Sequence, residues 1–213
     1  MAPGRGSFIT LEGGEGAGKT TLATTLAAAL RETGREVVLT REPGGTPNAE
    51  TLRALLVEGE TGRWSAIAET LLMFAARVDH VERLVKPALD RGAVVICDRF
   101  TDSTRAYQGA AGGVAPDRIE AIQRAALGGF EPDLTFIVDL DPAIGLARTQ
   151  ARGEGETRFE RQPEAFHRAL RRAFLEIAES APDRCVVLDG AEAAEAVAQA
   201  AMRALNERTG VLA

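Results

Sequence analysis

The feature that most constrains this sequence is a glycine-rich loop close to its N-terminus. It follows the apolar run Phe8–Leu11, precedes the helix-forming run Thr20–Arg31, and fits the pattern G-x-x-x-x-G-K-[ST]. The loop consists of Gly13, Gly14, Glu15, Gly16, Ala17, Gly18, Lys19 and Thr20. Glycine lets backbone N–H groups approach phosphate oxygens, and the start of a helix adds partial positive charge. We therefore expect a strand–loop–helix unit that binds a nucleoside triphosphate, with Lys19 on the β- and γ-phosphates and the Thr20 hydroxyl on Mg²⁺.

The rest of the chain alternates between two kinds of apolar pattern. Short runs that are apolar throughout indicate strands buried on both faces. They are Phe8–Leu11, Val37–Thr40, Val94–Cys97, Leu134–Val138 and Val186–Leu188. Longer segments with 3.6-residue apolar spacing indicate helices, for example Thr20–Arg31, Glu69–Leu89, Asp117–Leu127, Pro163–Glu179 and Ala191–Arg208. This alternation predicts an α/β fold: a three-layer sandwich around a five-stranded parallel sheet.

The composition of the chain argues against several classes of binding partner. The net charge of −6 argues against a nucleic-acid wrapper and against a polybasic membrane binder. The two cysteines, Cys97 and Cys185, lie in apolar runs and are expected to be buried thiols, because a zinc site needs more ligands at closer spacing. No apolar run reaches membrane-spanning length, and residues 1–7 do not resemble a signal peptide. We expect a cytoplasmic protein that binds neither nucleic acid nor membrane.

A second group of polar residues ends the third predicted strand. Asp98 and Arg99 follow the run Val94–Cys97, at the edge where open parallel sheets bind ligands. Asp98 is placed to hold Mg²⁺, directly or through water, and Arg99 to bridge two phosphates, although both could instead form a surface salt bridge. The guanine-reading pattern N-K-x-D and the switch pattern D-x-x-G of GTPases do not occur in the chain. A kinase is therefore favoured over a GTPase.

Five segments carry a family resemblance. They read FITLEGGEGAGKTTL (8–22), TREPGGTP (40–47), LLMFAARVDHV (71–81), CDRFTDSTRAYQG (97–109) and VDLDPAIGLARTQARGEGETRFE (138–160). In this order they resemble bacterial thymidylate kinases over about residues 8–190. The resemblance implies a P-loop nucleoside-monophosphate kinase of one domain, residues 1–213, with a mobile lid at about 148–161. It also implies phosphorylation of thymidine monophosphate by ATP with Mg²⁺, for dTTP supply, and a homodimer packed through the long helix predicted at Glu69–Leu89.

The same resemblance implies roles for residues of the acceptor side. Glu15 would reach the sugar 3′-hydroxyl or the magnesium shell, and Arg53 and Arg99 would hold the acceptor phosphate. Arg77 would donate to a thymine carbonyl and Gln108 would pair with the base edge. The other implied acceptor contacts are Glu42, Pro43, Ser103, Thr104 and Tyr107. Tyr107, the only tyrosine, would crowd the 2′ position and so favour deoxyribose.

One position departs from the family pattern. Where the family stacks an aromatic ring on the base, four residues before the Arg77 equivalent, this chain has Met73. Phe74 follows, three residues before Arg77. Residues three and four apart share a helix face, so either side chain could contact the base, and Phe74 could equally be a core residue.

Taken alone, the charged segment Arg152–Arg161 is typical of a solvated surface loop, whereas the resemblance implies a lid at about 148–161. Arg148, Arg152 and Arg158 would close over the triphosphate, with Gly153 and Gly155 as hinges. The phosphate loop carries Glu15 and no arginine, as in the subtype whose catalytic arginine comes from the lid. Arg152 is the leading candidate for that arginine.

No general base is expected. The acceptor phosphate has a second pKa of about 6 and is mostly a dianion near pH 7. Asp98 is therefore expected to position Mg²⁺ rather than to take a proton. His80 and His167 are expected to be ordinary residues of a helix face or of the surface.

Two other functions stay open from the sequence. The first is another nucleoside-monophosphate or nucleoside kinase of the same fold. The second is a nucleotide-dependent switch or partner-binding ATPase, which would hydrolyse ATP slowly and would not respond to thymidine monophosphate.

Overall fold

A parallel sheet forms the centre of the computed structural model, which describes residues 5–152, without the side chain of Arg152, and residues 158–210. Five strands pair in the order β2-β3-β1-β4-β5 within this part of the chain. They are β1 (Phe8–Glu12), β2 (Val37–Arg41), β3 (Val94–Asp98), β4 (Leu134–Asp139) and β5 (Cys185–Asp189). Every residue of the central strand β1 is buried. The predicted α/β fold with a five-stranded parallel sheet is confirmed.

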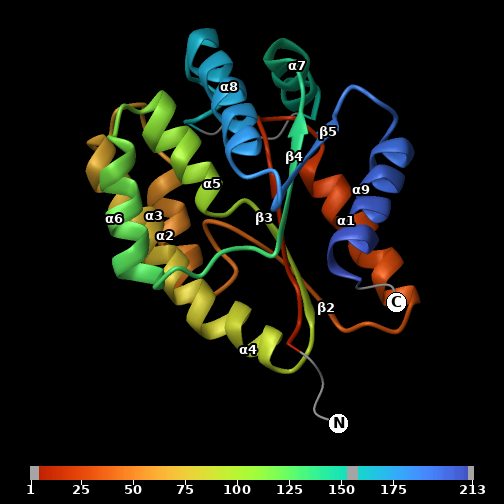
Figure 1. The fold of residues 1–213 in the computed structure, drawn as a ribbon. Helices are drawn as coiled ribbons and strands as arrows, with labels where there is room; N and C mark the ends of the chain where they lie inside the picture. The colour runs from red at the N-terminus through yellow and green to blue at the C-terminus, as the bar shows by residue number, and fades with distance from the viewer. Residues whose placement is uncertain (1–4, 153–157, 211–213) are drawn as a thin grey trace.

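Helices cover both faces of this sheet (Figure 1). On one face lie α1 (Lys19–Glu32) and α9 (Ala194–Thr209), which pack against each other and against the strands. The other segments are α2 (Pro47–Val57), α3 (Ala66–His80), α4 (Lys86–Asp90), α5 (Thr101–Thr104), α6 (Pro116–Leu127), α7 (Pro142–Arg152), α8 (Glu164–Ser180) and the π-helical η1 (Val81–Val85) and η2 (Arg105–Ala111). The opposite face is covered mainly by α3, α4, α6 and α8 (Figure 1). The result is the expected three-layer sandwich.

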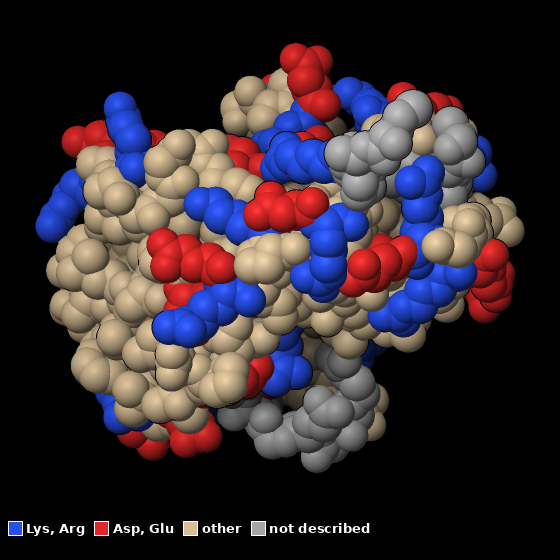
Figure 2. Space-filling view, turned by 90° about the horizontal axis from the view of Figure 1, so that it is seen from below, with Lys and Arg blue, Asp and Glu red and all other residues tan. Residues whose placement is uncertain are grey.

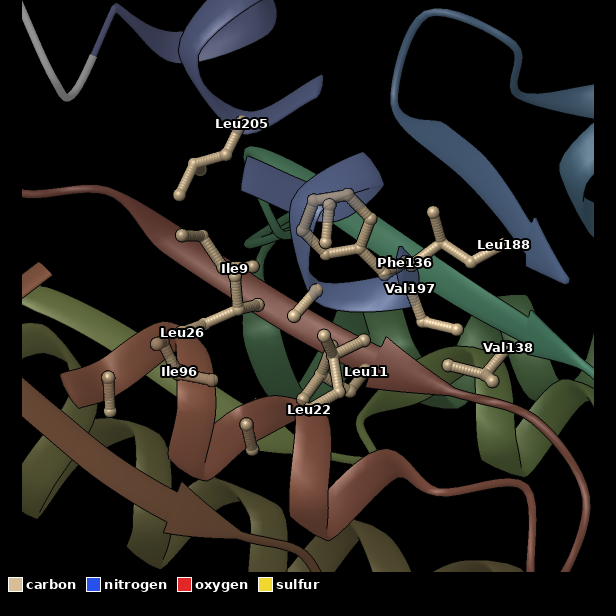
Figure 3. Packing of buried hydrophobic residues seen from close by; sticks show 14 of the residues in the cluster. Ile9, Leu11, Leu22, Leu26, Ile96, Phe136, Val138, Leu188, Val197 and Leu205 are labelled. Carbon is tan, nitrogen blue, oxygen red and sulfur yellow. The ribbon is translucent and has the colours of Figure 1, made fainter. Parts of the chain in front are cut away.

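The core follows from the two-sided burial of the strands. Figure 3 shows side chains of β1 and β4 meeting those of α1 and α9, with Phe136 near the middle and Ile9 and Leu26 to its left. All three of these side chains are fully buried. A second apolar cluster joins the other sheet face to α3, η1, α4 and α6, and a third joins it to η2 and α8. Because each face has a cluster, the sheet has a fixed position between the helix layers.

Each predicted strand extends one residue further at its C-terminal end than its apolar run. The added residues are Glu12, Arg41, Asp98, Asp139 and Asp189. These polar residues gather at one edge because parallel strands all end there. The backbone still pairs in the sheet at these positions, and the side chains of Arg41 and Asp98 line a cavity at this edge.

The predicted helices are confirmed within a few residues at their ends, with one difference. The segment predicted as one helix, Glu69–Leu89, is α3, η1 and α4 in sequence, so its middle turns are π-helical. Apolar spacing does not distinguish a π-helical turn from an α-helical one. Among the described helices, none combines the length and the apolar character needed to cross a membrane.

Acidic and basic side chains lie interspersed on the lower face of the molecule (Figure 2). On this face blue and red residues are neighbours, and a wide area on its left side carries few charges. Charges that alternate in sign leave no extended basic field on this face.

Candidate active site

The phosphate loop connects β1 to α1 at the C-terminal edge of the sheet. Gly13, Gly16 and Gly18 have positive φ angles of 134°, 65° and 98°, which side chains with a Cβ rarely adopt. The ammonium of Lys19 is buried beneath the loop and donates to Gly14 O at 2.7 Å and to Gly13 O at 3.2 Å. Burial, together with the nearby Arg99, lowers the pKa of Lys19. An anion beside this ammonium would offset its loss of hydration.

A hydroxyl and a carboxylate face each other across the start of α1. Thr20 Oγ1 donates to Asp98 Oδ2 at 2.9 Å. Within the described residues, no cluster of three or more His, Cys, Asp and Glu side chains forms a metal cage of protein groups alone. One hydroxyl and one carboxylate oxygen suit a hard cation that takes its remaining ligands from phosphate and water. The donor set therefore fits a divalent ion of the Mg²⁺ type.

Arg99 links the phosphate loop to the segment after β3. Its guanidinium donates to Gly13 O at 2.9 Å, to Glu15 Oε1 at 3.0 Å and to Ser103 Oγ at 3.2 Å. The Tyr107 hydroxyl donates to the same Glu15 oxygen at 2.7 Å. Burial alone would raise the pKa of Glu15, but the charges of Arg99 and Lys19 and the hydrogen bond from Tyr107 lower it to about 2. Glu15 is thus a carboxylate at any physiological pH.

A cavity of about 110 Å³ lies between this cluster and helices α2 and α3. It is lined by Glu15, Glu42, Pro43, Arg53, Val57, Met73, Arg77, Arg99, Phe100, Ser103, Thr104, Tyr107, Gln108 and Phe159. Apolar side chains such as Val57, Met73 and Phe159 form much of its wall, and the arginines among its lining residues supply positive charge. Such a combination suits a ligand with a flat apolar part and an anionic part.

Arg77 is held in this cavity by a chain of buried polar groups. Its Nε donates to Glu42 Oε2 at 2.6 Å and its Nη2 to Phe100 O at 3.1 Å. Glu42 Oε1 in turn contacts His80 Nδ1 at 2.8 Å, and His80 Nε2 contacts Thr40 Oγ1 at 2.8 Å. The remaining nitrogen, Nη1, is buried without a hydrogen-bond partner among the described residues. A buried donor of this kind is satisfied when a ligand presents an acceptor to it.

The structure separates the two candidates for contact with the base. Met73 lines the cavity, whereas Phe74 is 2% exposed in the apolar cluster under α3 and does not line it. The Phe74 ring instead packs against the Arg77 guanidinium, 4.8 Å from ring centre to carbon. Of the two side chains, Met73 is therefore the one that faces the cavity, and Phe74 packs against Arg77 in the core.

Two further cavities continue along the same edge. A cavity of about 260 Å³ surrounds the phosphate loop and contains the cationic side chains Lys19, Arg41, Arg53 and Arg99. It shares Glu15, Glu42, Arg53 and Arg99 with the apolar cavity. A third cavity, of about 420 Å³, shares the loop residues 16–18 and Thr21 with the second and is lined by Arg148 and Gly190. The three cavities thus follow one another, from apolar, through cationic, to the region beside α7.

Most of the expected site residues come together, but those of the lid segment do not all face the phosphate loop. Arg148 donates to Gly190 O at 3.1 Å beside the third cavity. Arg158 is buried and lines none of these three cavities. Its Nε donates to Leu56 O at 2.5 Å, and its guanidinium pairs with Glu69 on α3. Its assignment to ATP stays a prediction that this geometry does not favour. The expected hinges and the side chain of Arg152 lie outside the described residues.

Two other residues expected on the acceptor side form hydrogen bonds within the protein. Arg53 Nη1 donates to Pro43 O at 2.8 Å, and Gln108 Nε2 donates to Glu69 Oε1 at 2.7 Å. Burial and the neighbouring Arg41 lower the pKa of Arg53. An anion between these arginines would relieve their repulsion.

Both histidines lie on helices, as expected, but a position at the surface is wrong for both. His80 is fully buried and His167 is 4% exposed. His80 can be buried because each of its ring nitrogens has a hydrogen-bond partner, Thr40 or Glu42. Sequence patterns could not show this, because the partners are about 40 residues away.

Sequence reasoning missed several residues that line these cavities: Val57, Phe100 and Phe159 in the apolar cavity, and Thr21, Arg41 and Glu160 in the cationic cavity. Phe159 lines the apolar cavity and packs edge-to-face on Tyr107, with ring centres 5.5 Å apart. Arg41 lines the cationic cavity. Glu12 is fully buried directly before the phosphate loop. Glu12 and Arg41 end parallel strands, the same signal that identified Asp98.

Comparisons with known proteins agree with this geometry. The family model described as "Thymidylate kinase" matches residues 11–201. The chain is 52% identical over 207 residues to the thymidylate kinase of Caulobacter vibrioides, covering 97% of this chain and 99% of that protein. It is 53% identical over 192 residues to the thymidylate kinase of Pseudomonas putida strain GB-1, and this alignment covers 90% of this chain and 91% of that protein.

A solved structure adds the fold. The crystal structure of thymidylate kinase from Ehrlichia chaffeensis matches with a TM-score of 0.76 and 35% identity, covering 95% of this chain and 99% of that one. The match of family model, sequence and structure extends over nearly the whole chain. Together with the phosphate loop and the adjoining apolar cavity, it shows that the chain belongs to the thymidylate kinase family.

Proposed function

We propose that this chain transfers the γ-phosphoryl group of ATP to thymidine monophosphate, giving thymidine diphosphate for dTTP synthesis. The observation that carries this proposal is the wall shared by two cavities. Glu15, Arg53 and Arg99 line both the cationic cavity over the phosphate loop and the apolar cavity beside it. A triphosphate in the first and a monophosphate at the end of the second would have their reacting groups side by side. Such positioning, with charge neutralisation, is most of what phosphoryl transfer requires.

The acceptor phosphate needs no protein base. With a second pKa of about 6 it is mostly a dianion near pH 7 and can attack directly. Arg99 and Arg53 lie where they would hold this anion by bidentate contacts. Lys19 would contact the β- and γ-phosphates from the opposite side. These cations offset the repulsion between donor and acceptor and stabilise the charge spread over the transferring group.

The nucleoside would occupy the apolar cavity. The unpartnered Arg77 Nη1 would donate to a thymine carbonyl, and the Gln108 amide would contact the base edge. Met73 would pack on the ring, and Tyr107, held by Glu15, would leave little room for a 2′-hydroxyl. This pocket chemistry favours thymidine monophosphate over the other nucleoside or nucleoside-monophosphate acceptors. A nucleotide-dependent switch or a partner-binding ATPase transfers no phosphoryl group to a second nucleotide and therefore needs no apolar cavity beside the phosphate loop.

Mg²⁺ is the proposed metal. Thr20 Oγ1 and Asp98 Oδ2 would hold it, directly or through water, and bound there it would neutralise charge on the β- and γ-phosphates. Asp98 thereby acts in positioning and does not accept a proton. Thr20 follows Lys19 in the first turn of α1, so both groups are fixed by one rigid element.

For the donor side we propose that Arg148 contacts ATP and that Arg152 supplies the transition-state guanidinium. Both lie on α7, which runs beside the third cavity. This proposal places the chain in the subtype that has a glutamate, here Glu15, in the phosphate loop and the catalytic arginine in the lid. We propose that residues 1–213 form one domain with a lid at about 148–161.

We also propose that the protein is located in the cytoplasm. Its cysteines Cys97 and Cys185 are free, buried thiols, which fits a reducing compartment. We further propose a homodimer that packs through α3, which carries the exposed apolar side chain of Leu71.

An assay of ADP release with each nucleoside monophosphate in turn tests the reaction. Thymidine monophosphate should give the highest kcat/KM, and Lys19→Ala should lower the rate by 10²-fold or more because the buried ammonium is lost from the phosphates. Rapid transfer by Lys19→Ala, or equal rates with every nucleotide, would contradict the proposal. ATP hydrolysis that does not respond to any acceptor would instead support an ATPase.

A further inference from the structure

The backbone of Arg99 is held in an uncommon conformation. Its φ of 72° is the only positive value at a non-glycine position among the described residues. Side chains with a Cβ adopt this region rarely, so the surroundings must hold the backbone there. The Arg99 N–H donates to Leu11 O at 2.9 Å, and Arg99 O accepts from Cys97 Sγ at 3.1 Å. These two contacts hold the backbone of Arg99 itself. The turn of chain that follows Arg99 is held by other groups.

Glu12 holds that next turn. Its Oε1 accepts from the backbone N–H of Phe100 at 2.7 Å and of Ser103 at 3.2 Å, and its Oε2 lies 2.6 Å from Ser103 Oγ. Phe100 precedes the first residue of α5 and has no side-chain oxygen to cap the helix. A carboxylate from the neighbouring strand β1 therefore performs the capping that the sequence at the helix start cannot.

The position of Glu12 in the chain makes this contact relevant to the site. Glu12 is the last residue of β1 and is bonded covalently to Gly13, the first residue of the phosphate loop. Its side chain reaches the opposite way, to the start of the segment that carries Ser103, Tyr107 and Gln108. The same carboxylate thus connects the donor loop with the acceptor helix.

We infer that Glu12 is a positioning residue for the acceptor site: by capping α5 from β1 it fixes Arg99 and Ser103 relative to the phosphate loop. The inference rests on the proposed function, because it concerns the site for thymidine monophosphate. Glu12 itself is fully buried and touches neither donor nor acceptor cavity. Its effect must therefore pass through the Arg99 turn and α5.

The hydrogen bonds, rather than the charge, are what this role requires. Glutamine at position 12 keeps the side-chain length and an oxygen that accepts from both backbone N–H groups. Aspartate keeps the carboxylate but is one methylene shorter, so it cannot reach both. Glu12→Gln and Glu12→Asp therefore separate reach from charge. Thr10→Val is the matched control, because it removes a buried hydrogen bond of the same strand, to Thr135, and removes no hydrogen bond to α5.

The test is steady-state kinetics of the full chain with both substrates varied, after thermal unfolding has established that each variant is folded. Glu12→Asp should raise the KM for thymidine monophosphate about tenfold or more, the size expected for lost hydrogen bonds to buried donors, and change the KM for ATP by less than about threefold. Glu12→Gln and Thr10→Val should stay within about threefold of the parent for both substrates.

Other outcomes are equally clear. An unchanged KM for thymidine monophosphate in Glu12→Asp, equal effects of Asp and Gln, or a parallel rise of both KM values overturns the inference. If Glu12→Asp does not fold, hydrogen exchange decides in the unaltered chain: the amides of Phe100 and Ser103 should be strongly protected, and rapid exchange overturns the inference. Failure of the parent chain to phosphorylate thymidine monophosphate would instead contradict the proposed function.

Discussion

At the scale of single residues, Arg99 shows how the site combines strain and charge. Its positive φ costs on the order of 1–3 kcal/mol for a residue with a Cβ. In return its guanidinium reaches Gly13 O, Glu15 and Ser103 at once. A glycine would adopt the backbone without strain but would remove the cation. The strained arginine is therefore explained by the contacts its side chain makes.

Arg152 is the residue whose loss should affect the chemical step most directly. We predict that Arg152→Ala lowers kcat by 10²-fold or more, because a guanidinium that stabilises transferring phosphoryl charge acts mainly in the transition state. Single-turnover and steady-state rates with ATP and thymidine monophosphate measure the effect. Arg168→Ala, which removes an exposed arginine paired with Glu164, is the control. A parent-like kcat in Arg152→Ala would remove the assignment.

At the scale of elements, the close approach of α7 to the phosphate loop is decisive. A Cβ added to Gly145 would lie 2.2 Å from Glu15 O, and one added to Gly16 would lie 2.0 Å from Gly145 O. These are backbone atoms, so a side chain at either position must move the helix or the loop. Two glycines thus allow α7 to lie directly on the loop.

Gly145→Ala should therefore displace α7 and with it Arg148. We predict that kcat/KM for ATP falls by about 10- to 10²-fold, since a misplacement of about 1 Å in a phosphoryl-transfer site has effects of this size. Titration of ATP at saturating thymidine monophosphate gives the measurement. Ile144→Ala, at the neighbouring exposed position, should have little effect. Parent-like kinetics in Gly145→Ala would show that the loop tolerates the displacement.

At the scale of the whole molecule, Glu12 links the site to stability. Burial and the nearby Asp102 raise the pKa of Glu12 from 4.5 to about 7, although the hydrogen bond from Ser103 and the charge of Arg99 act in the opposite direction. The folded chain then binds this proton more tightly than the unfolded chain. The contribution of Glu12 to stability is thus lost as the pH rises from about 4.5 to about 7.

We predict that Glu12→Gln removes this dependence. The free energy of unfolding of the variant minus that of the parent should rise by about 1.4 kcal/mol per pH unit within the window, or ~3 kcal/mol in all, and level off above it. Urea unfolding at several pH values measures the difference. A difference that does not change with pH between 4.5 and 7 would contradict the raised pKa.

Association of the chain can be tested through α3. Leu71 on this helix is 52% exposed, the highest value among the large apolar side chains of the described residues. We predict that Leu71→Arg converts a dimer to a monomer, because a buried, unpaired charge in an interface is strongly unfavourable. Sedimentation equilibrium of parent and variant gives the masses. Exposed Ile144→Arg, on α7, should leave the mass unchanged, and a monomeric parent would contradict the homodimer.

Much of this molecule could be predicted because its determinants are local. The phosphate loop, the five apolar runs and the polar residues Asp98 and Arg99 at a strand end are all readable from short segments. Helices α2, α5 and α7 were harder to predict, because their apolar spacing is short or interrupted. The link from Thr40 through His80 and Glu42 to Arg77 joins segments about 40 residues apart, and no local pattern encodes it.

The sequence by itself determined the five strands, the longer helices and the triphosphate loop and, through the family resemblance, the residue types on the acceptor side. Only the tertiary structure decided that Met73 faces the cavity while Phe74 is core, that Arg158 pairs with Glu69, and that Glu12 caps α5. The physical reason is the range of the forces involved. Backbone geometry and periodic burial act over a few residues, whereas the partner of a buried polar group is fixed only when distant strands and helices have packed.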